Sequence, residues 1–272
     1  MRLIFILSLI CISGCYSQSI DPEIHIVYDF EYDKFIDSKK KRVEKTILIV
    51  QPSKSYFSYK TSFNLAVTRT TKTVSDMGVL MYNIKPNFII ATESKKDSLN
   101  FYEYIGGKIY DYKEKVDLEW EFDESTKIIL GYTCHKVRTS YGSRNWIGWY
   151  CKDIAISRGP YKFNGLPGAL LEISSDDGLF KFSASEIYRV EDSTSLNVLD
   201  FLLEPNKEII SMERKKLNRF RNKYDNLSPG ERAYVNRPDK NAEYTIMTID
   251  ESGERKAVEY NRRQRNYIEK IN

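Results

Sequence analysis

The segment from Gly159 to Ile173 constrains the fold of this chain more than any other segment. Its fifteen residues contain three glycines and two prolines among aromatic and aliphatic side chains. Asn164 and Gly165 suit a turn that needs positive φ at both central residues. Pro167 and Gly168 suit a type II turn, in which glycine supplies the positive φ. Together with Leu166 they predict a stiff chain reversal, which we call the signature corner (Asn164–Gly168), leading into a strand at Ala169.

Short segments of alternating or β-branched and aromatic residues occupy most of the chain before residue 190. Residues 24–32 place Ile24, Ile26, Tyr28, Phe30 and Tyr32 on one face, as expected for a half-buried strand. The other predicted strands are 46–50, 55–59, 88–92, 101–105, 108–112, 120–122, 127–132, 134–139, 145–151, 169–173 and 179–190. The 20 tyrosines and 13 phenylalanines suit half-buried sheet faces. We therefore predict a mainly β (α+β) protein, with a large curved antiparallel sheet or half-barrel.

The pattern changes after Leu199. Glu204-Pro205-Asn206 is a typical helix start, and an apolar stripe with helical spacing follows it. The residues of this stripe are Ile209, Ile210, Met212, Leu217, Phe220 and Tyr224. Ser228-Pro229-Gly230 is expected to end the helix, and 244–249 and 255–260 to form a hairpin. The predicted division is a β domain over 19–199, and a C-terminal helix that packs on the sheet with a charged hairpin appendage over 200–272.

The N-terminus has the features of an export signal. Arg2 precedes a nearly uninterrupted apolar run from Leu3 to Ile12, which is shorter than the roughly 20 residues of a membrane-spanning helix. Two cleavage positions compete. Residues 12–15 resemble a lipobox, with a signal ending at residue 14 and Cys15 as the lipidated residue. Cleavage after residue 18 would instead release a chain without an anchor. We expect an exported protein, either periplasmic or an outer-membrane lipoprotein, that associates with the membrane only through a lipid anchor.

The cysteine content and the net charge limit which cross-links and partners are expected. An oxidising compartment permits a disulfide between Cys134 and Cys151. The formal net charge is only +4, and the basic residues of the C-terminal region are interleaved with acidic ones. We therefore expect no nucleic-acid partner.

We identify no catalytic, cofactor-binding or metal-binding motif. The chain has only two histidines. His25 lies on the polar side of the first predicted strand and is expected to be exposed. His135 follows Cys134 directly, so the two side chains would point to opposite faces of a strand. A zinc site of Cys and His ligands is therefore not expected, nor is any other cofactor.

Two further groups of side chains have competing interpretations. Trp146, Trp149 and Tyr150 either belong to the core or line an aromatic groove. The carboxylates Asp117, Glu119, Glu121 and Asp123 alternate along one stretch, as on a solvated strand face, although a pair of catalytic carboxylates is the alternative. Asp176-Asp177-Gly178 is expected to be a hairpin turn.

Four segments, in the right order, resemble the GLPGLI family of bacterial envelope proteins. They are 131–136, the strand 145–151, the segment 159–173 and the C-terminal 265–269. Cys151 stands where that family usually has Thr, and Tyr267 where it has Pro. The resemblance implies a signal sequence and a location in a Gram-negative envelope. It implies no established activity, so it assigns no catalytic residue.

These observations favour a non-enzymatic envelope protein that binds or carries an apolar ligand, a lipid or an envelope partner. One alternative is an envelope hydrolase that uses paired carboxylates. Another is a structural accessory of an outer-membrane complex. A carrier requires a lined cavity or a concave apolar face rather than a filled interior, whereas a hydrolase requires carboxylates gathered in a cleft.

Overall fold

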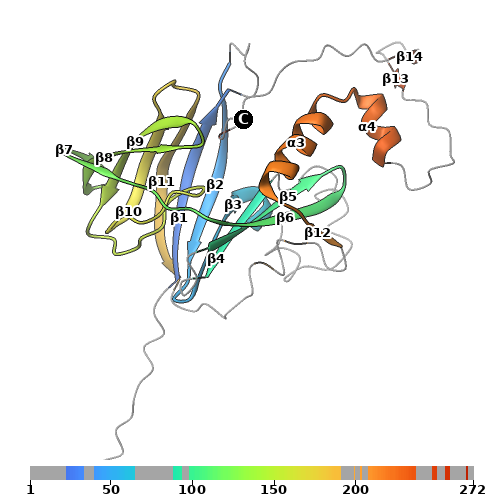
Figure 1. Ribbon diagram of the computed structural model, residues 1–272. Helices are drawn as coiled ribbons and strands as arrows, with labels where there is room; N and C mark the ends of the chain where they lie inside the picture. The colour runs from blue at the N-terminus through green and yellow to red at the C-terminus, as the bar shows by residue number, and fades with distance from the viewer. Residues whose placement is uncertain are drawn as a thin grey trace, which may run out of the picture.

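The computed structural model describes residues 23–33, 40–64, 88–93, 98–190, 199, 203, 208–236, 247–249, 255–257 and 268. A 12-stranded sheet dominates this part of the chain (Figure 1). Its strands are β1 (Glu23–Tyr32), β2 (Arg42–Val50), β3 (Lys54–Tyr59), β4 (Phe88–Glu93), β5 (Ser98–Ile105), β6 (Lys108–Lys115), β7 (Glu121–Ile129), β8 (Tyr132–Tyr141), β9 (Arg144–Cys151), β10 (Ala169–Ser175), β11 (Phe180–Val190) and β12 (Ile209–Ser211). The prediction of a mainly β protein with a large curved sheet is confirmed.

The strand order explains how distant segments meet. The sheet runs β12-β6-β5-β4-β3-β2-β1-β11-β10-β9-β8-β7. The first described strand, β1, therefore lies in the middle of the sheet. From there the strands β2 to β6 follow one another toward one edge, and β7 forms the opposite edge. Residues 116–120, which we call the connector, join β6 to β7 and cross the face of the sheet (Figure 1). Only β12 pairs in parallel, with β6, so the sheet is antiparallel apart from one edge strand.

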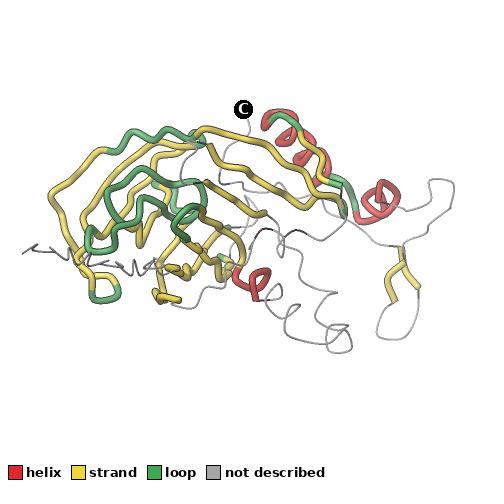
Figure 2. Tube along the Cα trace, turned by 90° about the horizontal axis from the view of Figure 1, so that it is seen from below, coloured by secondary structure: helices red, strands yellow, loops and turns green. Residues whose placement is uncertain are grey.

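The sheet is strongly curved, and its strands form an arch (Figure 2). Its inner face carries the larger core, in which phenylalanine rings stack: the Phe30 and Phe182 centroids are 4.3 Å apart. A smaller core covers the other face and includes Val27, Ile47 and Ile89. Burying each such side chain stabilises the fold by roughly 1.5–3 kcal/mol. Because both faces are covered around β1, His25 is buried, with only 4% of its surface exposed, between Phe63 and Tyr188. The prediction that His25 is exposed is wrong for this reason.

The segment between β9 and β10, residues 152–168, folds onto the inner face, and we call it the inner loop. It buries Tyr161, Lys162, Phe163 and Leu166. Backbone hydrogen bonds hold it together: Gly159 N donates to Phe163 O at 2.8 Å within the loop, and Ala169 N donates to Ile154 O at 3.0 Å across its ends. The inner loop, which includes the signature corner, thus fills the space beneath the arch.

The predicted turn types of the signature corner are only partly right. Gly165 has φ 88°, as expected, but neither Asn164 nor Gly168 has a positive φ. Gly168 is required for another reason: a Cβ at this position would lie 2.0 Å from the carbonyl oxygen of Cys151. Close approach of two backbone segments therefore demands this glycine, not a left-handed conformation.

The region after residue 208 differs from the prediction of one long helix. Residues 209–211 form β12, and helix α3 spans Arg214–Asp225. Ser228-Pro229-Gly230 does not end a helix but starts α4 (Pro229–Asn236). Ser228 and Glu231 form a reciprocal capping box there, with Glu231 N donating to Ser228 Oγ at 3.2 Å. The predicted packing on the sheet is confirmed, since Leu217 is fully buried in the inner core.

The predicted C-terminal hairpin is present as β13 (Met247–Ile249) and β14 (Arg255–Ala257), which pair antiparallel. The helices in the described part of the chain are too short or too polar to span a bilayer. Cys15 and both cleavage positions lie outside the described residues, so export and lipidation stay predictions. The domain boundary at 199/200 also stays a prediction, although β12 and α3 beyond it join the sheet and its core.

Candidate functional site

A groove of roughly 750 Å³ opens where the connector passes the β8–β9 hairpin and the β10–β11 turn. The groove is lined by charged, amide and indole groups. Its lining residues are Asp117, Glu119, Trp120, Glu121, Arg138, Thr139, Ser140, Asn145, Trp146, Ile147 and Asp176. A space of this volume is in the range of small-molecule binding sites.

Two hydrogen bonds hold the connector in place as one wall of the groove. The Thr139 hydroxyl donates to the carbonyl oxygen of Glu119 at 2.7 Å, which ties the connector to β8. The Trp120 indole N–H donates to the carbonyl oxygen of Asn164 at 2.8 Å, which ties it to the signature corner. The inner loop and the crossing connector therefore fix the position of Glu119 and Trp120 relative to the sheet.

The opposite wall comes from the tips of two hairpins. Asn145 at the start of β9 donates from its side-chain amide to the Asp176 carboxylate at 3.1 Å. The same asparagine accepts a hydrogen bond from the Ser140 hydroxyl at 2.8 Å. Asp176 belongs to the β10–β11 turn, where Gly178 has φ 69°, so the predicted hairpin turn at 176–178 is confirmed. Asp176 is thereby held beside the β8–β9 hairpin.

The groove brings three carboxylates that are neighbours in the sequence together with a fourth that is far from them. Asp117, Glu119 and Glu121 come from the connector and the first residue of β7, and Asp176 from the β10–β11 turn. All four residues are exposed to solvent. The sequence interpretation of a solvated strand face is wrong for Asp117 and Glu119, because they precede β7 and line the groove instead.

Asp123 does not line the groove, but it forms an ion pair with Arg138, which does. Hydrogen bonds from the Ser125 hydroxyl and backbone amide, and from Arg138, hold the pKa of Asp123 well below its usual range. The carboxylate therefore stays ionised at neutral pH. Arg138, the one basic residue among the described lining residues, donates to Asp123 at 2.9 Å.

The three aromatic residues proposed from the sequence do not line one groove together. Trp146 is fully buried, with its indole N–H donating to the carbonyl oxygen of Tyr141 at 3.0 Å, and it forms the floor of the groove. Tyr150 is 3% exposed and belongs to the core. Trp149 is half-buried on the other face of β9, beneath Lys127. The ring with surface left to offer a ligand is Trp120, which the sequence analysis did not single out.

Lys162, which was not predicted from the sequence as a notable residue, has a fully buried side chain. Its ammonium group donates to Tyr112 Oη at 2.7 Å and to Glu114 Oε2 at 2.8 Å. Four aromatic rings lie within 4.9–5.8 Å of the same nitrogen: Phe101, Tyr112, Tyr141 and Tyr161. Cation–π contacts and the Glu114 partner compensate the cost of burying this charge. This cage anchors the inner loop to β6 and does not face the groove.

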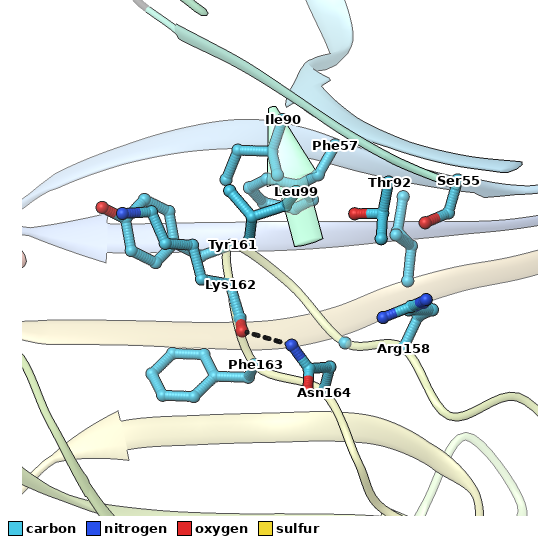
Figure 3. Close-up of a pocket in the computed structure, with 12 residues that line it drawn as sticks. Ser55, Phe57, Ile90, Thr92, Leu99, Arg158, Tyr161, Lys162, Phe163 and Asn164 are labelled. Atoms are coloured by element: carbon cyan, nitrogen blue, oxygen red, sulfur yellow. Dashed lines mark hydrogen bonds between the residues drawn. The ribbon is translucent and has the colours of Figure 1, made fainter. Parts of the chain in front are cut away.

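Little free volume remains under the inner loop. The pocket between Arg158, Lys162 and the strands has a volume of only about 20 Å³, room for about one water molecule. Figure 3 shows Arg158 on the same side of this pocket as Ser55 and Thr92, with Lys162 on the other side. The space between the inner loop and these strands is thus nearly filled, and this pocket is too small for the apolar ligand of a carrier.

Cys134 and Cys151 are directly opposite each other on β8 and β9, and both are buried. Their thiols are separate in this structure. Burial, with the neighbouring Cys151 as a smaller cause, raises the pKa of Cys134 to about 11. A disulfide between them stays a prediction. Among the described residues, no group of three or more His, Cys, Asp or Glu side chains is placed to hold a metal ion.

Comparison with known proteins gives one family match and a likeness to solved structures. Residues 110–203 match the family described as N-glycanase peptide, N-terminal domain. Two solved structures of PNGF-II, in space groups C2 and P21, share the fold with TM-scores of 0.51 and 0.50 at 15% identity. Each alignment covers 73% of this chain and 32% of the PNGF-II chain, so this chain spans about a third of those proteins. No curated protein matches the chain.

These findings correct two conclusions from the sequence. The resemblance to the GLPGLI family is wrong, since the family model that matches is the N-glycanase N-terminal domain. The expectation of a non-enzymatic carrier of apolar ligands or envelope partners is also wrong, because the same match points to glycanases. The alternative of a hydrolase with gathered carboxylates agrees better with both the comparisons and the groove.

Proposed function

We propose that this chain is an N-glycanase-related hydrolase that acts on N-glycosylated peptides, with the groove as its carbohydrate site. One observation carries the proposal. All residues that line the groove, from Asp117 to Asp176, lie within the segment 110–203 that matches the glycanase family. The fold brings four of their carboxylates to one opening beside an exposed part of Trp120.

The groups in the groove suit the binding of a sugar. Carboxylate and amide side chains exchange hydrogen bonds with hydroxyl groups, and an indole face packs against the apolar face of a pyranose ring. Trp120 lies between Glu119 and Glu121 in the sequence, and its own N–H is engaged by Asn164. The ring is therefore already oriented before a ligand arrives, which lowers the entropic cost of binding.

The same carboxylates supply the groups that hydrolysis needs. Removal of an N-linked glycan adds water across the bond between the asparagine side-chain carbonyl and the glycosyl nitrogen. One carboxylate accepts a proton from the attacking water while the other orients that water, and the captured proton then passes to the departing nitrogen. Glu119 and Glu121 are the pair we assign to these roles, because they flank Trp120 on the wall fixed by two hydrogen bonds.

Hydrolysis of an N-glycosylated peptide by the purified chain tests this function. We expect release of the glycan and conversion of its asparagine to aspartate, both visible by mass spectrometry. Glu119→Gln and Glu121→Gln should each lower the rate about 100-fold or more, the usual contribution of a general acid or base. Glu124→Gln is the matched control, since Glu124 is an exposed carboxylate of β7 that does not line the groove.

A second candidate function follows from the coverage of the solved structures. This chain corresponds to about a third of PNGF-II, and the matching family is described as an N-terminal domain. The chain would then hold the glycosylated peptide while a separate hydrolase cleaves it. Glycopeptide binding without release of the glycan supports this candidate over the first. Absence of both binding and release contradicts both.

A further inference from the structure

The groove carries a strong excess of negative charge. Asp117, Glu119, Glu121 and Asp176 line it, against the single guanidinium of Arg138 among the described lining residues. Beside the groove, the ammonium group of Lys115 lies 3.8 Å from the Asp117 carboxylate. Both of these side chains are mostly exposed, so this pair offsets little of the charge.

The positive charge of Arg138 is already engaged. Its guanidinium donates to Asp123 Oδ2 at 2.9 Å, outside the set of lining residues. Lys136 contacts the same carboxylate at 3.6 Å. On the opposite wall, Arg144 forms an ion pair with Asp177, and the neighbouring Asp176 also interacts electrostatically with it. Arg138 and Lys136 thus share the Asp123 carboxylate, and among the described residues four carboxylates line the groove against the one guanidinium of Arg138.

We propose that the groove selects uncharged glycans and discriminates against glycans that end in acidic sugars, such as sialylated, uronic or sulfated ones. This specificity rests on the proposed function, because it assumes that a glycan occupies the groove. Neutral sugars donate their hydroxyl groups to the four carboxylates and stack on Trp120. An acidic sugar brings a like charge into the same space. Three net negative charges at about 8 Å in water disfavour such a ligand by roughly tenfold at low ionic strength.

Asp117 and Asp176 determine this specificity in our proposal, since they lie at the two sides of the groove and are separate from the pair assigned to hydrolysis. Asp117 belongs to the connector, and Asp176 to the β10–β11 turn. Replacing either by asparagine keeps its size and its capacity to accept hydrogen bonds. The change removes one negative charge and adds no bulk.

The test compares two glycopeptides that share one peptide and one glycan core, with and without terminal sialic acid. Equilibrium binding is measured at low salt and at about 0.5 M salt, where charges are screened within a few ångströms. We expect the neutral glycopeptide to bind about tenfold more tightly at low salt, and the ratio to approach one at high salt. Asp117→Asn and Asp176→Asn should each reduce the low-salt ratio about twofold. The control Glu124→Gln should leave it unchanged.

Binding of the neutral glycopeptide by each variant shows that the variant is folded and keeps its site. Equal affinity for the two glycopeptides at low salt, or tighter binding of the sialylated one, overturns the charge selection while the proposed function stands. Failure to bind or cleave either glycopeptide overturns the proposed function and this inference with it.

Discussion

At the scale of single residues, buried charge decides how the inner loop is held. Lys162 has no exposed side-chain surface, yet it carries an ammonium group between four rings and the Glu114 carboxylate. Glu114 also accepts from Arg214 of α3. The Glu114 carboxylate of β6 therefore connects this strand to the inner loop and to helix α3.

Replacing Lys162 by methionine should destabilise the protein. The variant keeps most of the apolar volume but removes the ammonium group, which leaves Glu114 buried with one fewer cation. Breaking a buried ion pair on one side costs about 3–5 kcal/mol, and the remaining Arg214 partner places the expected loss near the lower end. The free energy of unfolding, measured by urea denaturation, checks this.

A double-mutant cycle provides the control for this prediction. If the cost comes from an uncompensated charge, Lys162→Met combined with Glu114→Gln should be less destabilising than the sum of the two single changes. Additive losses would contradict the coupling and would leave lost packing as the cause. Such a buried lysine could not be predicted from the sequence, because the glycines and prolines around Lys162 predict turns, and turns are usually exposed.

At the scale of elements, the sequence pattern located most strands, since alternation and turn residues are local signals. It failed where contacts between distant segments decide the structure. His25 has the neighbours of an exposed strand residue, and only the covering of the second face by Phe63 and Tyr188 buries it. Residues 209–211 have helical spacing, but pairing with β6 makes them a strand. The groove was not predictable, because only the strand order brings Asp176 and Glu119 to the same opening.

The signature corner shows the same limit for a single glycine. Gly168→Ala should be strongly destabilising, because the new Cβ would lie 2.0 Å from the carbonyl oxygen of Cys151 and 3.0 Å from Lys152 Cα. These are backbone atoms at the end of β9 and just after it, so relief requires the inner loop to move off β9. We expect a loss of about 3 kcal/mol or more in the free energy of unfolding, as for other strained or overpacked sites.

Gly178→Ala is a useful comparison for the corner. Gly178 has φ 69°, but a Cβ added there would meet no atom within 4 Å, so only conformational strain of about 1 kcal/mol is expected. A Gly168→Ala variant no less stable than Gly178→Ala would show that close approach to β9 is not what fixes the corner.

At the scale of the whole molecule, the sheet grows outward in both directions from its first strand. β1 pairs with β2 on one side and with β11 on the other, although β11 lies far away in the sequence. Local hairpins complete each half, while the connector joins β6 to the far edge at β7. The groove lies where this crossing meets the β8–β9 hairpin, so its walls depend on both the long-range closure and the local turns.

This arrangement predicts a gradient of local stability across the sheet. Ile26, Val27 and Tyr28 are fully buried residues of β1, which pairs on both sides, with one register shift against β11 between Val27 and Tyr28. Because burial and the regular pairing with β2 cover this point, their backbone amides should exchange with solvent only through global unfolding. Strand β7 is the edge, interrupted by an irregularity between Phe122 and Thr126, and Phe122 and Ile128 are more than 60% exposed. The amides of β7 should exchange earliest among strands β7 to β11. Hydrogen–deuterium exchange followed by mass spectrometry measures the protection of both strands, and equal protection of β1 and β7 would contradict this contrast between centre and edge.

Because Glu121 begins β7, addition of a glycopeptide that occupies the groove should slow exchange in β7 while leaving β1 unchanged.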